Sequence, residues 1–154
     1  MYDTILIPAD GSDEARKAAQ HGIELADVLG ATVHTLYVMD LPGAPRALSI
    51  RDDEEQVRRE YREYGERVTE EVGEMASDDG VECVTALKTG TVHEEIVKYA
   101  DEEGMDAIVM GTGYYGRFGA LLGTVTEKVV RLSPVPVIST KLGEAEARSR
   151  VADS

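Results

Sequence analysis

The sequence predicts an α/β fold, a single three-layer domain in which a five-stranded parallel sheet carries helices on both faces. The chain of 154 residues suits one domain of ordinary size. Short β-branched runs alternate with longer segments of helical period, in the order β-α-β-α-β-α-β-α-β. Strands joined by crossover helices lie parallel with right-handed connections, so the helices are expected to cover both faces of the sheet.

The first half of the chain is expected to hold two strands and two helices. Residues 4–8 are the first strand, and Ser12 is placed to cap a helix that Gly30 ends. Residues 32–39 are the second strand, and a long helix begins near Asp52. Apolar residues recur along that helix at three- and four-residue spacing, at Val57, Tyr61, Tyr64, Val68, Val72 and Met75.

The second half continues the alternation. A strand, a helix, a strand, a helix and a strand are expected over residues 81–87, 91–103, 107–110, 124–132 and 135–139. The nearly continuous apolar run 107–110 indicates a strand buried on both faces. We place the domain at residues 1–142. Residues 143–154 lack an apolar period and are predicted to form a flexible C-terminal tail.

The charge of the chain argues against several classes of partner. Lys and Arg number 16 and Asp and Glu number 30, which gives a formal net charge of −14. A nucleic-acid backbone or an anionic membrane would be repelled over most of the surface, so neither is expected to bind. An acidic excess of this size suits a high-salt cytoplasm, where screening is strong, and it predicts a halophilic archaeon or a similar organism as the source.

The N-terminus and the cysteine content bear on location and redox chemistry. Residues 1–4 carry no basic region, and the chain lacks an apolar run of the length, about 18–20 residues, that spans a membrane. The predicted location is therefore the cytoplasm. Cys83 is the only cysteine, which precludes an intrachain disulfide and a cysteine-rich zinc site. We expect it to be a buried, inert thiol.

Two loops with ligand-binding chemistry follow strands at their carboxyl ends. Residues 8–12 combine the carboxylate of Asp10 with a helix N-terminus, and the glycine-rich residues 111–119 follow the fourth strand. Open parallel sheets bind ligands at this edge, where the strand order reverses. If the first and fourth strands are neighbours, both loops face one crevice. Loop amides and the helix that opens at Gly123 and Thr124 would then receive phosphate oxygens without a basic patch.

Purely structural roles compete with these functional ones. A glycine-rich loop is often only a turn, Asp10 can serve as a turn former, and Thr124 can serve as a helix N-cap. The aromatic residues Tyr114, Tyr115 and Phe118 either pack the loop down or cover a ligand or partner. The sequence leaves both readings open at each position.

The glycine-rich loop is not a dinucleotide fingerprint, although Gly111, Gly113 and Gly116 match its spacing. That fingerprint belongs in the first strand–turn–helix unit, with an acidic residue closing the next strand. Here the glycines follow the fourth strand instead. The chain also lacks the Gly-Lys-Ser/Thr of a P-loop and the Gly-x-Ser-x-Gly of a serine hydrolase.

Three stretches of the sequence resemble the universal stress protein (UspA) family, and the resemblance covers about residues 3–141. They are residues 5–12, residues 110–112, and residues 122–131 running into 133–137. The resemblance implies a Rossmann-like sheet in strand order 3-2-1-4-5, with an ATP site between strands one and four in one branch of the family. It also implies a homodimer formed through the last strand, which is expected to begin at Val135 and end at Ser139.

By position, the resemblance implies a site for ATP or AMP, with Mg²⁺ bound beside the nucleotide. Adenine would lie near Val38 and the backbone of Pro8 and Ala9. Asp10 would lie near the ribose and phosphates, where it would hold the metal ion. Arg117 would be the charge partner of the phosphates. The expected nucleotide-binding residues are Pro8, Ala9, Asp10, Val38, Met110, Gly111, Gly113, Gly116, Arg117, Gly123, Thr124 and Val125.

The loop departs from the pattern Gly-x2-Gly-x9-Gly-Ser/Thr of ATP-binding members. Nine residues separate Gly113 from Gly123, but Met110 stands where the first glycine belongs. We predict a stress-response regulator that binds an adenine nucleotide. At most weak ATP hydrolysis is expected, because no histidine lies in either loop. The alternative is a dimeric protein-interaction module of the same fold that has lost nucleotide binding.

Overall fold

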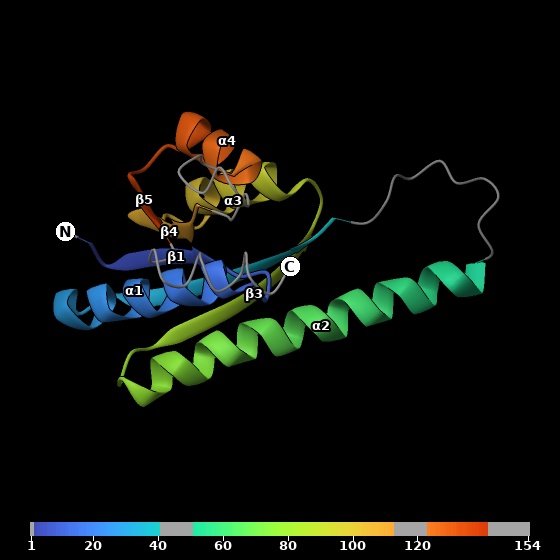
Figure 1. Cartoon of the computed structure of the whole chain (residues 1–154), viewed down its shortest axis with the longest axis horizontal. Helices are drawn as coiled ribbons and strands as arrows, with labels where there is room; N and C mark the ends of the chain where they lie inside the picture. The colour runs from blue at the N-terminus through green and yellow to red at the C-terminus, as the bar shows by residue number, and fades with distance from the viewer. Residues whose placement is uncertain (1, 41–50, 113–122, 142–154) are drawn as a thin grey trace, which may run out of the picture.

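The sheet has the topology that the sequence and the family resemblance predict. The computed structural model describes residues 2–40, 51–112 and 123–141, and Figure 1 shows how they are arranged. All neighbouring strands are parallel, in the order β3-β2-β1-β4-β5. The elements are β1 (Thr4–Pro8), α1 (Asp13–Leu29), β2 (Thr32–Met39), α2 (Arg51–Asp78), β3 (Cys83–Thr89), α3 (Val92–Glu102), β4 (Ala107–Gly111), α4 (Thr124–Leu132) and β5 (Val137–Thr140).

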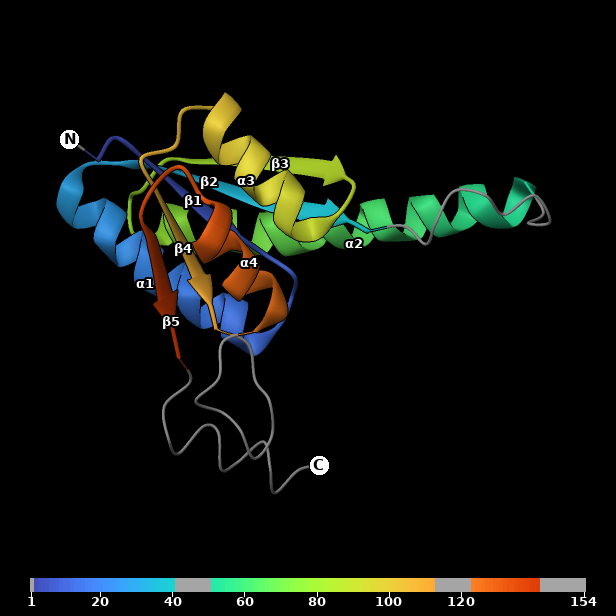
Figure 2. The same cartoon turned by 90° about the horizontal axis from the view of Figure 1, so that it is seen from above.

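The helices cover the two faces of the sheet in pairs, α1 with α2 and α3 with α4 (Figures 1 and 2). The central strand β1 serves both cores, because alternate side chains of a strand point to opposite faces. Ile5 and Ile7 belong to the core beneath α1 and α2, together with Ile23. Leu6 belongs to the core beneath α3 and α4, together with Val129. The order of strands thus places the carboxyl ends of β1 and β4 side by side.

The ends of the first helix follow the predicted capping chemistry. The Ser12 side chain accepts a hydrogen bond from the Ala15 N–H at 3.2 Å. Gly30 ends the helix in the left-handed conformation, with φ of 69°. This conformation is cheap for glycine and costly for residues that carry a Cβ.

Two strands begin two residues later than predicted. The N–H of Val81 donates to the Ala76 carbonyl at 2.8 Å and closes the end of α2, so β3 starts only at Cys83. Pro136 has no N–H for the ladder, and β5 starts at Val137 and ends at Thr140. The predicted helix over residues 91–103 is confirmed as α3 with one residue fewer at each end. The predicted tail, residues 143–154, lies outside the described residues.

The helix α2 extends past the carboxyl ends of the strands that it covers, as both cartoon views show (Figures 1 and 2). Val68 and Val72 are buried against the sheet, with 7% and 4% of their surface exposed. Val57 and Tyr61, nearer the N-terminus of α2, are 38% and 37% exposed. The predicted apolar stripe is therefore core only in its C-terminal half. We call residues 54–62 of α2 the arm.

The single cysteine is only partly as predicted. Cys83 is half-buried rather than buried, and burial raises the pKa of its thiol to about 11. A thiol with this pKa is almost wholly protonated near neutral pH, which makes it a poor nucleophile. Within the described ranges, no helix combines the length and the apolar character that crossing a bilayer requires.

Candidate functional site

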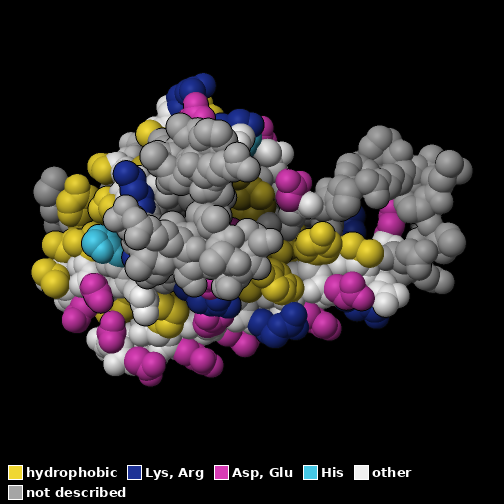
Figure 3. All heavy atoms as spheres, in the orientation of Figure 1, with side chains coloured by type: hydrophobic (Ala, Val, Ile, Leu, Met, Phe, Trp, Pro, Cys, Tyr) yellow, Lys and Arg dark blue, Asp and Glu magenta, His cyan; other side chains and the backbone are white. Residues whose placement is uncertain are grey.

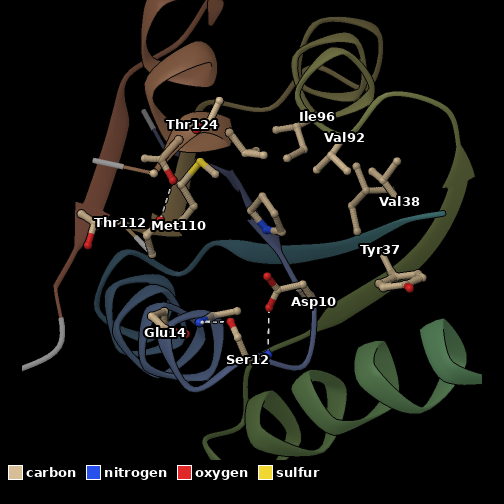
Figure 4. A pocket seen from close by; sticks show the side chains of 18 residues that line it. Asp10, Ser12, Glu14, Tyr37, Val38, Val92, Ile96, Met110, Thr112 and Thr124 are labelled. Atoms are coloured by element: carbon tan, nitrogen blue, oxygen red, sulfur yellow. Dashed lines mark hydrogen bonds between the residues drawn. The ribbon is translucent and has the colours of Figure 1, made fainter. Parts of the chain in front are cut away.

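A pocket of about 340 Å³ opens at the carboxyl ends of β1, β2 and β4 (Figure 4). It brings together the two loops that the sequence singles out, although they lie about a hundred positions apart in the chain. The expected site residues that line it are Pro8, Ala9, Asp10, Val38, Met110, Gly111, Gly123, Thr124 and Val125. The other expected site residues, Gly113, Gly116 and Arg117, lie outside the described residues, as do Tyr114, Tyr115 and Phe118.

The loop after β1 presents the Asp10 carboxylate to the pocket (Figure 4). Asp10 Oδ1 accepts the Ser12 N–H at 2.8 Å, an Asx turn that orients the carboxylate. Gly11 follows with φ of +84°, and a Cβ there would collide with the Tyr64 hydroxyl group. The turn therefore requires glycine for two independent reasons, its backbone conformation and the close approach of α2.

Tyr64 of α2 holds this loop from the side. Its hydroxyl donates to the Asp10 carbonyl oxygen at 2.9 Å, and its ring meets the Tyr37 ring edge-to-face at 5.6 Å between centroids. The sequence analysis treats Tyr64 only as one member of an apolar stripe. Nothing in the local sequence distinguishes it, because the contact joins residues 54 positions apart.

The residues on either side of the glycine-rich loop, Gly111 and Gly123, are fixed by contacts within the protein. A Cβ on Gly111 would lie 2.9 Å from the Glu14 carbonyl oxygen, so this strand end packs directly on the first turn of α1. Thr126 Oγ1 donates to the Gly111 carbonyl at 2.7 Å. The Gly123 N–H donates to the Thr112 carbonyl at 2.5 Å. This N–H is therefore already hydrogen-bonded within the protein, while Gly123 itself lies in the pocket lining.

The first turn of α4 faces the same pocket. Gly123 is the N-cap residue of α4 and makes no side-chain cap hydrogen bond. Thr124 and Val125 line the pocket at this end. A helix N-terminus carries partial positive charge and N–H groups without intrahelical partners, which together favour an anion.

The opposite end of the pocket is apolar. Val38 of β2 meets Val92 and Ile96 of α3 there, with Leu36 behind them. The sequence analysis includes Val38 and misses Val92 and Ile96. Their i,i+4 spacing shows an apolar helix face, but only the strand order shows that this face borders the pocket.

The described pocket offers one exposed carboxylate for a metal ion and no histidine. Asp10 and the buried Glu14 are the acidic residues of its lining. No group of three or more His, Cys, Asp or Glu side chains gathers anywhere among the described residues. A Mg²⁺ ion at Asp10 would therefore need phosphate oxygens and water to complete its coordination, which is how Mg²⁺ commonly binds with nucleotides.

Comparisons with known proteins agree with this fold. A model of the Universal stress protein family matches residues 1–141. The universal stress protein MJ0531 of Methanocaldococcus jannaschii is 35% identical over 147 residues, covering 95% of this chain and 86% of that protein. The solved structure of protein MJ0577, from the same archaeon, is 30% identical with a TM-score of 0.78, covering 94% of this chain and 99% of that one.

A third relative was solved with a ligand. The universal stress protein from Archaeoglobus fulgidus in complex with dAMP is 25% identical with a TM-score of 0.65, and the match covers 91% of this chain and 98% of that one. Strand order, pocket position and sequence similarity along nearly the whole chain lead to one conclusion. This chain belongs to the universal stress protein family.

Proposed function

We propose that this protein is a stress-response regulator that binds an adenine nucleotide, ATP or AMP, in the pocket between β1 and β4, with little or no catalysis. One observation carries the proposal: a single pocket joins an apolar end, formed by Val38, Val92 and Ile96, to the N-terminus of α4. A nucleotide has the same polarity, with a flat base at one end and phosphates at the other. The dAMP complex of the Archaeoglobus fulgidus relative supports this ligand class.

In this proposal each part of the nucleotide has its own region of the pocket. The base packs between Val38 and Val92, and the ribose lies beside Asp10. The phosphates meet the first turn of α4 at Thr124 and Val125, where backbone N–H groups serve as donors and no Lys or Arg is among the described lining residues. Asp10 would hold a Mg²⁺ ion that the phosphates also bind, and the ion would offset carboxylate–phosphate repulsion.

Little or no hydrolysis of the nucleotide is part of this proposal. Phosphoryl transfer to water needs a group that positions or deprotonates the attacking water. Within the described part of the chain, no histidine lines the pocket, and His34 is instead bonded to the Tyr99 hydroxyl at 2.8 Å.

The proposal is tested by titrating the purified protein with AMP, ATP and cyclic AMP in a calorimeter at near-physiological salt. Val92→Asp places a carboxylate at the apolar end and should weaken AMP binding at least about tenfold, because a charge must then be buried against the base. Val130→Asp is the matched control: Val130 is 47% exposed and lies outside the pocket lining, so its substitution should leave AMP affinity unchanged.

Two outcomes would contradict this proposal. Failure of every adenine nucleotide to bind would favour the interaction module described next. ATP turnover that Asp10→Ala abolishes would show that the protein is an enzyme.

A second candidate function is a dimeric interaction module. In the described sheet β5 pairs only with β4, so one edge of β5 is left without a partner strand. Val130 and Leu132 of the neighbouring α4 are 47% and 54% exposed. An unpaired edge beside exposed apolar side chains is a natural surface for a second copy. Light scattering should give about twice the chain mass of 16.7 kDa if this edge forms a dimer.

A further inference from the structure

A second hollow lies at the carboxyl ends of β2 and β3, outside the nucleotide pocket. Its volume is about 480 Å³. Four residues of the arm line it, in the region where α2 continues past the ends of the strands (Figure 2). The residues that line it are Met39, Glu55, Arg58, Arg59, Arg62 and Thr89.

The arginines occupy the inner face of α2 rather than its solvated back. The buried face of α2 over the sheet follows the helical spacing Gly65, Thr69, Val72, Ala76. Arg62 and Arg58 continue the same stripe toward the N-terminus, in steps of three and four residues. The residue type on this face therefore changes from small and apolar to arginine at the point where the sheet ends.

These guanidinium groups have no carboxylate partner among the described residues. The ion pairs there join Arg16 to Asp13 and Glu71, and Arg131 to Glu127. Residues 41–50, which link β2 to α2, contain no Asp or Glu in their sequence, and Asp52 and Asp53 at the start of α2 have side chains that lie outside the described ones. Among the described residues of a chain of net charge −14, three arginines without a carboxylate partner line one hollow, which makes its charge differ from that of the chain as a whole.

We propose that this hollow binds a phosphate-bearing anion, of the size of a di- or triphosphate group, at a site separate from the nucleotide pocket. Guanidinium groups bind phosphate oxygens bidentately and keep their charge at every physiological pH. Thr89, the last residue of β3, and Glu55 also line the hollow, so the site holds one hydroxyl group and one carboxylate besides the three arginines. A hollow lined by three cationic side chains suits a compact anion better than an extended acidic peptide.

The experiment measures binding of tripolyphosphate to the full-length protein by calorimetry at low salt. We expect saturable binding that weakens about tenfold in Arg58→Gln and in Arg62→Gln, because each change removes a charge-assisted contact. Arg67→Gln is the matched control: it removes the same charge from the same helix, but Arg67 lies over the Tyr64 ring and outside the hollow. Circular dichroism verifies that each variant is folded.

A further variant separates this site from the nucleotide pocket. Val125→Glu places a negative charge at the N-terminus of α4, where the nucleotide phosphates are proposed to bind. Tripolyphosphate binding should survive this change, whether or not the protein binds AMP. The inference is thus independent of the proposed nucleotide site, and either can fail without the other.

Four results would overturn the inference. The first is no tripolyphosphate binding at low salt, and the second is an equal loss in Arg67→Gln, which would indicate diffuse electrostatic attraction. The third is loss of binding in Val125→Glu with no effect of the arm substitutions, which would place the anion in the nucleotide pocket. The fourth is tighter binding of a glutamate-rich peptide than of tripolyphosphate, which would make the arm a protein-docking surface.

Discussion

Tyr64 connects α2 to the proposed nucleotide site by a hydrogen bond. Its hydroxyl holds the Asp10 carbonyl at 2.9 Å, directly beside the glycine turn that orients the Asp10 carboxylate. The carboxylate itself is exposed at the pocket, so its position depends on the backbone that carries it. A single hydrogen bond from outside the loop thus contributes to the geometry of the site.

Removing this hydroxyl should loosen the Asp10 loop. We expect Tyr64→Phe to lower the free energy of unfolding by about 0.5–1.5 kcal/mol, the net contribution of one hydrogen bond, and to weaken AMP binding severalfold. Chemical denaturation and calorimetry measure the two effects. Tyr61→Phe serves as the control, because Tyr61 has nearly the same exposure, 37% against 38%, and no hydroxyl bond among the described residues. Identical behaviour of the two variants would contradict the role assigned to Tyr64.

His34 should make stability depend on pH. Burial lowers its pKa below the ordinary value of 6.5, an effect that the Glu103 carboxylate opposes. The unfolded chain therefore binds a proton on His34 at a higher pH than the folded chain does. Stability is retained above about pH 6.5 and is lost as the pH falls through that value toward the lower folded pKa.

The test compares urea unfolding near pH 7.5 and pH 5.5, the range that spans the unfolded pKa. The wild type should lose more stability over this interval than His34→Gln, which cannot take up the proton. His21→Gln changes an exposed histidine of α1 and should retain the wild-type pH dependence. If His34→Gln loses as much stability between pH 7.5 and pH 5.5 as the wild type does, groups other than His34 cause the acid sensitivity.

At the scale of elements, close backbone approach brings the two pocket loops together. Gly111 at the end of β4 lies against the backbone of Glu14 in α1, and a Cβ would come within 2.9 Å of a carbonyl oxygen. Backbone atoms cannot move aside as a flexible side chain does. The contact therefore sets how near β4 stands to the first turn of α1, and so sets the width of the pocket.

Gly111→Ala should separate these elements. We expect a loss of about 1–3 kcal/mol in the free energy of unfolding, typical of overpacking, together with weaker AMP binding. Gly73→Ala is the matched control, because a Cβ there would only touch Thr85 Cγ2 at 4.0 Å. Since Gly73 lies inside α2, alanine should stabilise the protein by about 0.5–1 kcal/mol. Thermal and denaturant unfolding of both variants measures the difference, and equal effects would contradict the packing argument.

At the scale of the whole molecule, the acidic surface dominates the electrostatics. Asp and Glu side chains are spread over the part of the surface formed by α1 and α2 (Figure 3). A net charge of −14 on 154 residues produces self-repulsion that disfavours the folded state. We propose that the chain is adapted to a high-salt interior, where this repulsion is screened.

Salt should therefore stabilise the protein. The melting temperature is expected to rise by several degrees between about 0.1 and 3 M KCl, because the Debye length falls from about 10 Å to a few ångströms. Differential scanning calorimetry over a KCl series measures the change, with sucrose at matched viscosity as a control for solvent effects. A melting temperature that does not rise with KCl would remove the halophilic interpretation.

The sequence by itself was sufficient to predict the elements of the fold and several of the residues that line the pocket. Hydrophobic period located the strands and helices, and Ser12 and Gly30 marked the ends of α1, because capping depends on nearest neighbours along the chain. The first residue of β3 was predicted two positions too early, because the Val81 N–H bonds to the Ala76 carbonyl at the end of α2, a contact that periodicity does not reveal.

Only the tertiary structure shows which of those elements contact one another. Val92 and Ile96 line the pocket only because the folded sheet brings α3 beside β2. Two hydrogen bonds also depend on the folded chain, from the Tyr64 hydroxyl to the Asp10 carbonyl and from the Gly123 N–H to the Thr112 carbonyl. Because α2 is longer than the strands that it covers, Arg58 and Arg62 line a hollow and are not part of the core. Local sequence governs backbone conformation within a few residues, whereas these contacts join distant segments and form only when the whole sheet is assembled.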